Sequence, residues 1–283
     1  MITARGFVPI VAAVGAAAVA SAHAGVVATE KTVHGATMPF PPAVHLTAAF
    51  ANAARMLAAA PMQAAITVVL MRAGEWQPWL DQAQSLLSGA EAQRVARRHF
   101  QSDRNALALA YALHRLVLGR LLGLGATQVP LDRDPRGCPQ LAGPLAYTSL
   151  SHADGLIAVA VAPAPVGVDI EPRQRTQVMA AIAHCVLHID EVAALPSQDG
   201  PARNAALLGI WVRKEAVLKA AGVGLSVPME SFAAPSRAHL ALPALVAGPL
   251  QIRMLDAGPD GVAAVAGPAG VPVACHWLRP VLV

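Results

Sequence analysis

Two short patterns each occur twice in this chain, in the same order and at nearly the same spacing. Arg104-Asn-Ala opens one alanine-rich helical segment, and Arg203-Asn-Ala opens another 99 residues later. Asp154-Gly-Leu-Ile-Ala-Val-Ala160 returns 106 residues later as Asp260-Gly-Val-Ala-Ala-Val-Ala266. Each echo is weak alone, because alanine-rich helices match by chance. Two echoes in one order favour a duplicated unit of helix and strand, with a ligand cleft between the copies.

The fold class that follows is α+β, with two similar halves at residues 62–164 and 165–283. Ser88-Gly-Ala-Glu91 is an N-cap signal for a basic helix, and Gly123 and Gly125 end the long helix that follows it. The expected elements are strands at 65–70, 156–161 and 166–171, a helix at 103–122 and a helix through 211–219.

Residues 1–61 precede the first clear periodic pattern. An apolar stretch from Phe7 to Ala20 is followed by Ala22-His-Ala24, which resembles a secretory signal peptide and is too short for a membrane span. An extended reading frame ahead of a start at Met62 explains the same residues. In either case we expect residues 1–61 to lie outside the fold. Hydrophobic residues make up 55% of the chain, enough for a sizeable core in the remainder.

Charge and cysteine content limit the classes of partner and metal site that the chain can have. The net charge is +4, and the densest basic run, residues 94–99 with Arg104 beyond it, lacks the interleaved aromatic residues of a single-strand nucleic-acid groove. We therefore expect no nucleic-acid partner, and the run is either a solvated helix face or a phosphate contact. Three scattered cysteines show neither a disulfide framework nor zinc spacing, and His184 and His188 lack a third ligand.

Gly167-Val-Asp-Ile-Glu-Pro172 places two carboxylates on one side of a predicted strand. Asp169 and Glu171 alternate with Val168 and Ile170, so the acidic pair faces one way and the apolar pair the other. Two carboxylates roughly 7 Å apart repel each other unless a positive group lies beside them. The strand either turns a polar face to solvent or binds a hard cation such as Mg²⁺.

The helix from Trp211 carries a third acid and a base. Glu215 and Lys219 lie four residues apart on one helical face, as in an ordinary surface ion pair. Together with Asp169 and Glu171, however, they supply a third metal-type carboxylate and a cation for phosphate. Ser151-His152 precedes the echoed strand and also suits phosphate contact. The set indicates phosphoryl transfer on a phosphate-rich substrate.

These motifs resemble those of the Sfp-type 4′-phosphopantetheinyl transferases. The resemblance covers essentially all of residues 62–283 and preserves motif order and spacing. The motifs that carry it are Ser151-His152, Gly167-Val-Asp-Ile-Glu171, Trp211-Val-Arg-Lys-Glu-Ala-Val-Leu-Lys219 and Gly222-Val-Gly-Leu-Ser-Val-Pro228. The family fold has two similar α+β halves about a pseudo-twofold axis, which agrees with the internal echo.

The resemblance implies transfer of the phosphopantetheine arm of coenzyme A to a serine of an acyl or peptidyl carrier protein, with release of adenosine 3′,5′-bisphosphate. Asp169, Glu171 and Glu215 would hold Mg²⁺, and Glu215 and Lys219 would be catalytic. A serine hydroxyl needs a base to take its proton, and the metal offsets charge on the leaving phosphate. The residues implied to bind the coenzyme are Arg94, Arg104, Arg136, Ser151, His152, Lys214 and Lys219.

Two departures from the family pattern concern residues expected to bind the coenzyme. Gly137-Cys-Pro139 stands where the family commonly has Gly-Lys-Pro, and Ala106 stands where it often has arginine. We expect weaker coenzyme binding rather than inactivity. The alternatives are a coenzyme-binding or carrier-docking protein that no longer catalyses and, less favoured, a metal-dependent phosphate-ester hydrolase.

The implied substrates also bear on location. Coenzyme A and carrier proteins are cytosolic, so the resemblance implies a cytoplasmic protein with no membrane partner, and it favours the extended-start interpretation of residues 1–61. Members of this family type are usually monomeric. The carrier can belong to fatty-acid, polyketide, nonribosomal-peptide or siderophore synthesis.

Overall fold

The computed structural model describes residues 44–57, 65–135, 137–143, 146–236, 239–240 and 248–280. Between Pro41 and Val283 the chain forms one compact unit built on two four-stranded sheets. The described strands are β1 (Ile66–Arg72), β2 (Leu131–Arg133), β3 (Pro139–Leu141), β4 (Tyr147–Ala153), β5 (Leu156–Ala162), β6 (Gly167–Pro172), β7 (His239–Leu240), β8 (Leu250–Leu255), β9 (Gly261–Pro268) and β10 (Val273–Trp277). The described α-helices are α2 (Leu46–Ala53), α3 (Ala73–Trp76), α4 (Leu80–Ser85), α5 (Gly89–Ala96), α6 (Gln101–Leu122), α7 (Met179–Val186), α8 (Ile189–Val192) and α9 (Pro201–Ala220). The α+β class is confirmed.

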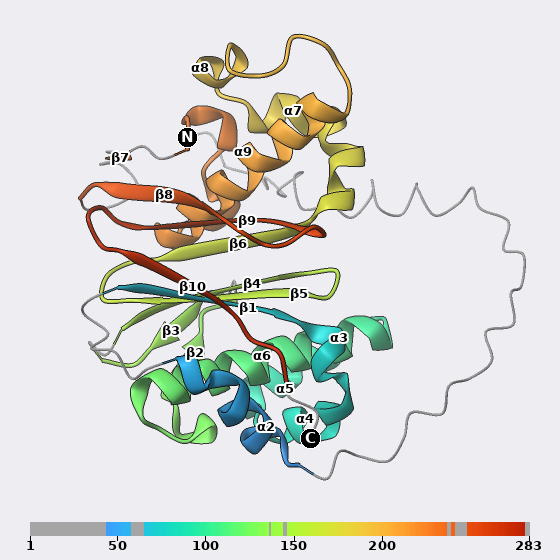
Figure 1. Ribbon diagram of the computed structural model, residues 1–283, viewed down its shortest axis with the longest axis vertical. Coiled ribbons are helices and arrows are strands. Elements are labelled where there is room, and N and C mark those ends of the chain that lie inside the picture. The colour runs from blue at the N-terminus through green and yellow to red at the C-terminus, as the bar shows by residue number, and fades with distance from the viewer. Residues whose placement is uncertain are drawn as a thin grey trace, which may run out of the picture. The chain divides into compact units, whose positions relative to one another are not determined.

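The two sheets pack face to face, and each has helices on its outer side (Figure 1). The first sheet has the order β10-β1-β5-β4 and the second β6-β9-β8-β7. Val68, Ala160 and Val168 belong to the apolar layer between the sheets. A second cluster joins the first sheet to α6, and a third joins the second sheet to α9. Strand β5 is buried along its whole length because it lies inside this stack.

The local signals read from the sequence correspond to real element ends. Ser88 and Glu91 form the reciprocal capping box that begins α5. Gly123 ends α6 in the left-handed conformation (φ 70°), which costs little for a residue without a Cβ. Past the end of α9, Gly222 and Gly224 also have positive φ. Both long helices, α6 and α9, are thus followed by glycines with positive φ, and apolar clusters pack each helix against its sheet.

The expectation that residues 1–61 lie outside the fold is wrong for residues 44–57. Helix α2 contributes Leu46 and Phe50 to the same core cluster as Trp76 and Trp79. The Trp79 Nε1–H donates to the Val44 carbonyl at 2.8 Å, and the Leu46 N–H donates to the Gln82 side chain at 2.7 Å. Trp76 and Trp79 would otherwise be exposed to water. Burying them is favourable, and helix α2, upstream of β1, provides the apolar surface that covers them. The signal-like stretch and the boundary at 61/62 lie outside the described residues.

The predicted boundary at residue 165 also needs a correction, because strand β10, from the predicted second half, belongs to the sheet of the first half. Strand β10 pairs in parallel with β1, from Ile66 opposite Val273 to Leu70 opposite Trp277. The edge of β1 would otherwise present unpaired backbone groups, and the chain end satisfies them. Residues 165–283 are therefore not a self-contained half. The pseudo-twofold relation between the halves stays a prediction.

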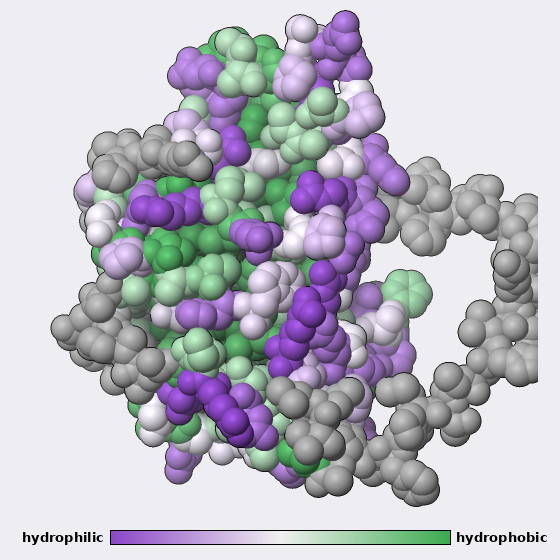
Figure 2. Space-filling model, in the orientation of Figure 1, coloured by the Kyte–Doolittle hydropathy of each residue, from purple (hydrophilic) through white to green (hydrophobic). Residues whose placement is uncertain are grey.

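The face drawn in Figure 2 has a mixed surface, on which hydrophilic side chains are interspersed among the apolar ones that lie across the sheets. No described helix is both long and apolar enough to cross a bilayer.

Candidate active site

The site is built where β6 runs beneath α9 (Figure 1). Val168 and Ile170 point into the layer between the sheets, so Asp169 and Glu171 face the other way, as predicted, and both are buried. Gly167 permits the close approach of the helix. A Cβ at this position would lie 2.0 Å from the Ala216 carbonyl oxygen of α9, a distance that no side chain tolerates. This glycine brings the acidic strand against the face of α9 that carries Glu215 and Lys219.

Asp169, Lys219 and Ser151 form a closed triangle. The Lys219 Nζ donates to Asp169 Oδ1 at 2.6 Å and to Ser151 Oγ at 3.0 Å, and Ser151 Oγ donates to the same Asp169 oxygen at 2.8 Å. Burial opposes the charge on Lys219, but the Asp169 and Glu215 carboxylates outweigh it and raise the pKa of this lysine. Lys219 is therefore a fixed cation, and its ion-pair partner is Asp169 rather than Glu215.

The other two carboxylates are less well compensated. Burial and the neighbouring Asp169 raise the pKa of Glu171 to about 7, although Arg175 pairs with Glu171 at 3.0 Å. Burial also raises the pKa of Glu215 to about 7; Lys219 opposes the rise and Asp169 adds to it. Among the described side chains, Glu215 has no ion-pair partner. The site thus holds more negative charge than its own cations neutralise.

Arg175 was missed in the sequence analysis. Its guanidinium lies 5.2 Å from the centroid of the Trp211 ring and pairs with Glu171 one turn earlier in the chain. The i, i+4 spacing was readable, but the segment from Arg173 to Val178 is a 3₁₀ helix that shows no amphipathic period. Arg175 therefore joins Trp211 of the motif helix to the acidic strand.

The donor set fits a hard cation. Asp169 Oδ2 is buried and has no hydrogen-bond partner among the described atoms, while Glu171 and Glu215 both carry raised pKa values. Carboxylate oxygens are the ligands that Mg²⁺ takes in proteins. In the part of the chain that the structure describes, no group of three His, Cys, Asp or Glu side chains is already arranged as a metal site. The residues therefore fit such an ion by the chemistry of their oxygen atoms.

Two hollows open beside this cluster. One, a cleft of about 600 Å³, is lined by Lys219 and by Cys138, Tyr147 and Thr148 among other residues. The second, of about 540 Å³, contains His152. Close packing around the ring, followed by the cations Lys219, Arg98 and Arg133, lowers the pKa of His152 to about 4 although the side chain reaches solvent. His152 is therefore neutral near pH 7 and can offer a hydrogen bond but no positive charge.

The remaining predicted coenzyme ligands lie in different places. Arg94 donates to the Asp134 carbonyl, beside the loop that carries Cys138. Arg104 donates to the Arg98 and His99 carbonyls and so closes the link between α5 and α6. Arg136 lies outside the described residues.

The structure corrects the predicted role of Lys214. It is completely buried, and its Nζ donates to the Val186 and Met229 carbonyls at 2.6 and 2.8 Å and pairs with Glu191 at 2.6 Å. All three ammonium hydrogens have acceptors on the side of α9 away from the carboxylate cluster. The prediction that Lys214 binds the coenzyme is therefore wrong. Neighbours in a helix point about 100° apart, so adjacency to Glu215 in the motif did not place Lys214 in the site.

Comparison with known proteins agrees with this geometry. The model of the 4′-phosphopantetheinyl transferase superfamily matches residues 165–249, the segment that contains the acidic strand and α9. The chain is 29% identical over 156 residues to the 4′-phosphopantetheinyl transferase psf-1 of Bacillus pumilus, an alignment that covers 55% of this chain and 66% of psf-1. It is 29% identical over 163 residues to HetI of a Nostoc species, covering 53% and 69% of the two chains.

A further relative, Sfp of Bacillus subtilis strain 168, is 26% identical over 149 residues, 52% of this chain and 66% of Sfp. The alignments thus span about two thirds of each of these relatives, all of which carry the same enzyme name. The family match falls on the strand and helix that build the carboxylate cluster. Residues 165–249 of this chain are thus similar to the 4′-phosphopantetheinyl transferase superfamily, and more than half of the chain aligns with enzymes of that name.

Proposed function

We propose that this protein transfers the 4′-phosphopantetheine arm of coenzyme A to a serine of an acyl or peptidyl carrier protein. The observation that carries the proposal is the three-carboxylate cluster on β6 and α9, closed by Lys219, with one buried Asp169 oxygen left without a partner. A cluster with excess negative charge suits a polyphosphate substrate only if a cation accompanies that substrate. Similarity to the 4′-phosphopantetheinyl transferases suggests the reaction class to which this chemistry belongs.

Asp169, Glu171 and Glu215 would hold the cation, for which Mg²⁺ is the natural candidate. When bound, Mg²⁺ supplies positive charge beside the pyrophosphate of the coenzyme. The lysine held by Asp169 and Ser151 adds a second, permanent positive charge at the edge of the 600 Å³ cleft. His152 contributes a neutral hydrogen-bonding group.

The transfer itself needs a base for the carrier serine. Glu215 lacks an ion-pair partner among the described residues, and it lies one helical turn before Lys219. Its carboxylate takes the proton as the serine oxygen forms a bond to the β-phosphorus of coenzyme A. The bond from that phosphorus to the bridging oxygen breaks, and adenosine 3′,5′-bisphosphate leaves with the electron pair. Lys219 stabilises the charge that develops on the departing phosphate.

The direct test is mass spectrometry of several apo carrier proteins after incubation with the full chain, coenzyme A and Mg²⁺. The expected result is a gain equal to the phosphopantetheine arm on the carrier serine, and no gain when chelator removes the metal. Asp169→Ala should abolish the gain, whereas Asp199→Ala, which removes a fully exposed acid, should leave it unchanged. Full transfer by Asp169→Ala would contradict the site assignment.

The same assay identifies the carrier class, because fatty-acid, polyketide and peptide-synthesis carriers can be compared side by side. Both substrates are cytosolic, so we propose a cytoplasmic location. We also propose a monomeric state, which light scattering of the purified protein tests.

A further inference from the structure

Cys138, which lines the 600 Å³ cleft, follows a tight turn that involves Asp134 and Gly137. The Gly137 N–H donates to the Asp134 carbonyl at 2.9 Å, and the Cys138 N–H donates to the Asp134 carboxylate at 2.8 Å. The hairpin that carries this loop is weak, since β2 and β3 pair over only three residues each. A two-stranded ribbon of that size is not stable alone. The loop must therefore be held by contacts outside the hairpin.

Two arginines hold it from below. Arg133 Nη1 donates to the Gly137 carbonyl at 3.5 Å, and Arg94 donates to the Asp134 carbonyl. Gly137 has a φ of 95° and lies directly over Arg94, whose Nη1 would be 3.3 Å from a Cβ at that position. The glycine thus lets the loop settle onto the Arg94 side chain while it adopts a left-handed conformation.

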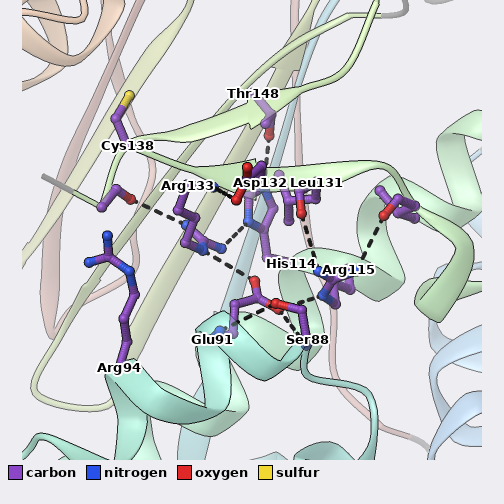
Figure 3. A network of polar contacts seen from close by, with 12 residues as sticks. Ser88, Glu91, Arg94, His114, Arg115, Leu131, Asp132, Arg133, Cys138 and Thr148 are labelled. Carbon is purple, nitrogen blue, oxygen red and sulfur yellow. Dashed lines mark hydrogen bonds and ion pairs between the residues drawn. The ribbon is translucent and has the colours of Figure 1, made fainter. Parts of the chain in front are cut away.

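The arginine at 133 is itself fixed by a buried carboxylate. Glu91 lies between two guanidinium groups, with Arg133 Nε at 3.2 Å from Oε1 and Arg115 Nε at 2.6 Å from Oε2 (Figure 3). All three side chains are less than 5% exposed. The Tyr111 ring lies under the Arg133 guanidinium, 4.0 Å from the ring centroid. A lysine could not reproduce this planar, forked set of contacts.

The network continues to a second cleft residue through His114. Arg133 Nη2 lies 3.0 Å from His114 Nδ1, and His114 Nε2 lies 2.8 Å from the Thr148 hydroxyl. Burial, with Arg133 and Arg115, lowers the pKa of His114 well below its usual value, so the ring is neutral. A neutral ring with its proton on Nε2 accepts from Arg133 and donates to Thr148, and Thr148 donates to the Ala160 carbonyl at 3.0 Å. One chain of contacts therefore reaches both the Cys138 loop and Thr148.

We propose that Glu91 and Arg133 are positioning residues for the coenzyme donor, because they hold two residues that line the cleft, Cys138 in its loop and Thr148 on β4. Neither residue touches the cleft, so they act through Gly137, His114 and Thr148. The inference rests on the proposed function for its kinetic test, but the position of the loop can be measured without any activity.

The kinetic test compares Arg133→Met with the unaltered full chain. Its Michaelis constant for coenzyme A should rise by about tenfold or more, with kcat changed by no more than about twofold and the constant for the carrier unaltered. Arg133→Lys keeps the charge but not the fork and should fall between the two. Trp79→Phe is the control for general destabilisation, because it removes the hydrogen bond to the Val44 carbonyl and touches none of the contacts that hold the loop.

The structural test uses the chain's own thiols. Cys138 is half-buried in the loop and Cys275 is exposed on β10, and both are free. In Arg133→Met and in Glu91→Gln, alkylation of Cys138 by iodoacetamide should be several-fold faster, while alkylation of Cys275 keeps its rate. Peptide mass spectrometry separates the two sites.

The outcomes are distinguishable. If the unaltered chain transfers no arm to any carrier, the proposed function fails, and the alkylation rates still test the loop. If Arg133→Met and Glu91→Gln alkylate Cys138 no faster than Trp79→Phe does, and the coenzyme constant is unchanged, the positioning role is overturned. A fall in kcat with an unaltered coenzyme constant also overturns it. If Arg133→Met does not fold, Arg133→Lys and Glu91→Gln decide the question.

Discussion

Two clusters on α9 contain buried acids and a lysine, and they differ in how completely their charges are matched. On one side of the helix, Glu191 accepts from Lys214, from the His188 N–H and from the Ala234 N–H, and Lys214 has three acceptors. On the other side, Asp169 keeps one oxygen without a partner in the described structure.

The contrast indicates that the Lys214–Glu191 pair stabilises the fold, whereas the Asp169 cluster is suited to binding and catalysis. A buried pair with every hydrogen bond made fixes α9 against the segments around Val186 and Met229, and it has no capacity left for a ligand. A buried cluster with unmatched negative charge is destabilising unless something positive arrives. The predictions below test this difference, beginning with the unmatched cluster.

The largest expected effect is on transfer activity in Glu215→Gln. Removing the base should lower kcat by about a hundredfold to ten-thousandfold. The same change should leave the melting temperature, measured without metal, equal or higher, since it removes a buried charge that Asp169 repels. Kinetics and thermal unfolding on one preparation measure both. A clear loss of stability with activity retained would reverse the assignment of this cluster.

The matched cluster should respond in the opposite way. Lys214→Met leaves Glu191 as a buried charge without its cation and should lower the free energy of unfolding by about 3–5 kcal/mol. Adding Glu191→Leu to the same chain should recover much of that loss, because no charge then remains buried. Urea unfolding curves of the single and double variants give the comparison. A cost below about 1 kcal/mol for the single variant would mean that the pair does not hold α9.

A smaller effect is expected for His114, in the fully bonded network of the first half. Its pKa is lowered in the folded protein, so the unfolded chain binds this proton more readily. The stability it contributes is therefore complete above the unfolded pKa of about 6.5 and is lost as the pH falls below it, by at most about 1.4 kcal/mol per pH unit. Urea unfolding at several pH values between 7.5 and 5 measures the slope. His114→Gln should show a shallower slope over that range; an equal slope would assign the effect elsewhere.

The sequence predicted the content of the site better than its contacts. The alternation of Asp169 and Glu171 with apolar residues, and the one-turn spacing of Glu215 and Lys219, follow from strand and helix periods and are readable locally. The ion-pair partner of Lys219 was not readable, because Asp169 is 50 residues away and meets it only through the close packing at Gly167. The same limit applies to β10, whose pairing with β1 joins opposite ends of the fold.

Helix α2 was not predicted from the sequence for a different reason. Its alanine-rich sequence shows little periodicity, and its place is decided by the apolar surface of Trp76 and Trp79, which lies later in the chain. The Glu91 network was not predicted, because its members come from α5, α6 and β2 and meet only in the folded chain.

The smallest effect is expected at an exposed pair that resembles neither cluster. Arg72 and Asp260 lie 2.8 Å apart, with side-chain exposures of 27% and 55%, and connect β1 to the turn before β9. Water already solvates both groups, so Asp260→Asn should change the free energy of unfolding by less than about 1 kcal/mol and the transfer rate not at all. The change should shrink further in 1 M salt, where charges are screened over about 3 Å. A loss as large as that of Lys214→Met, measured by the same urea curves, would show that distance alone and not burial sets the worth of an ion pair here.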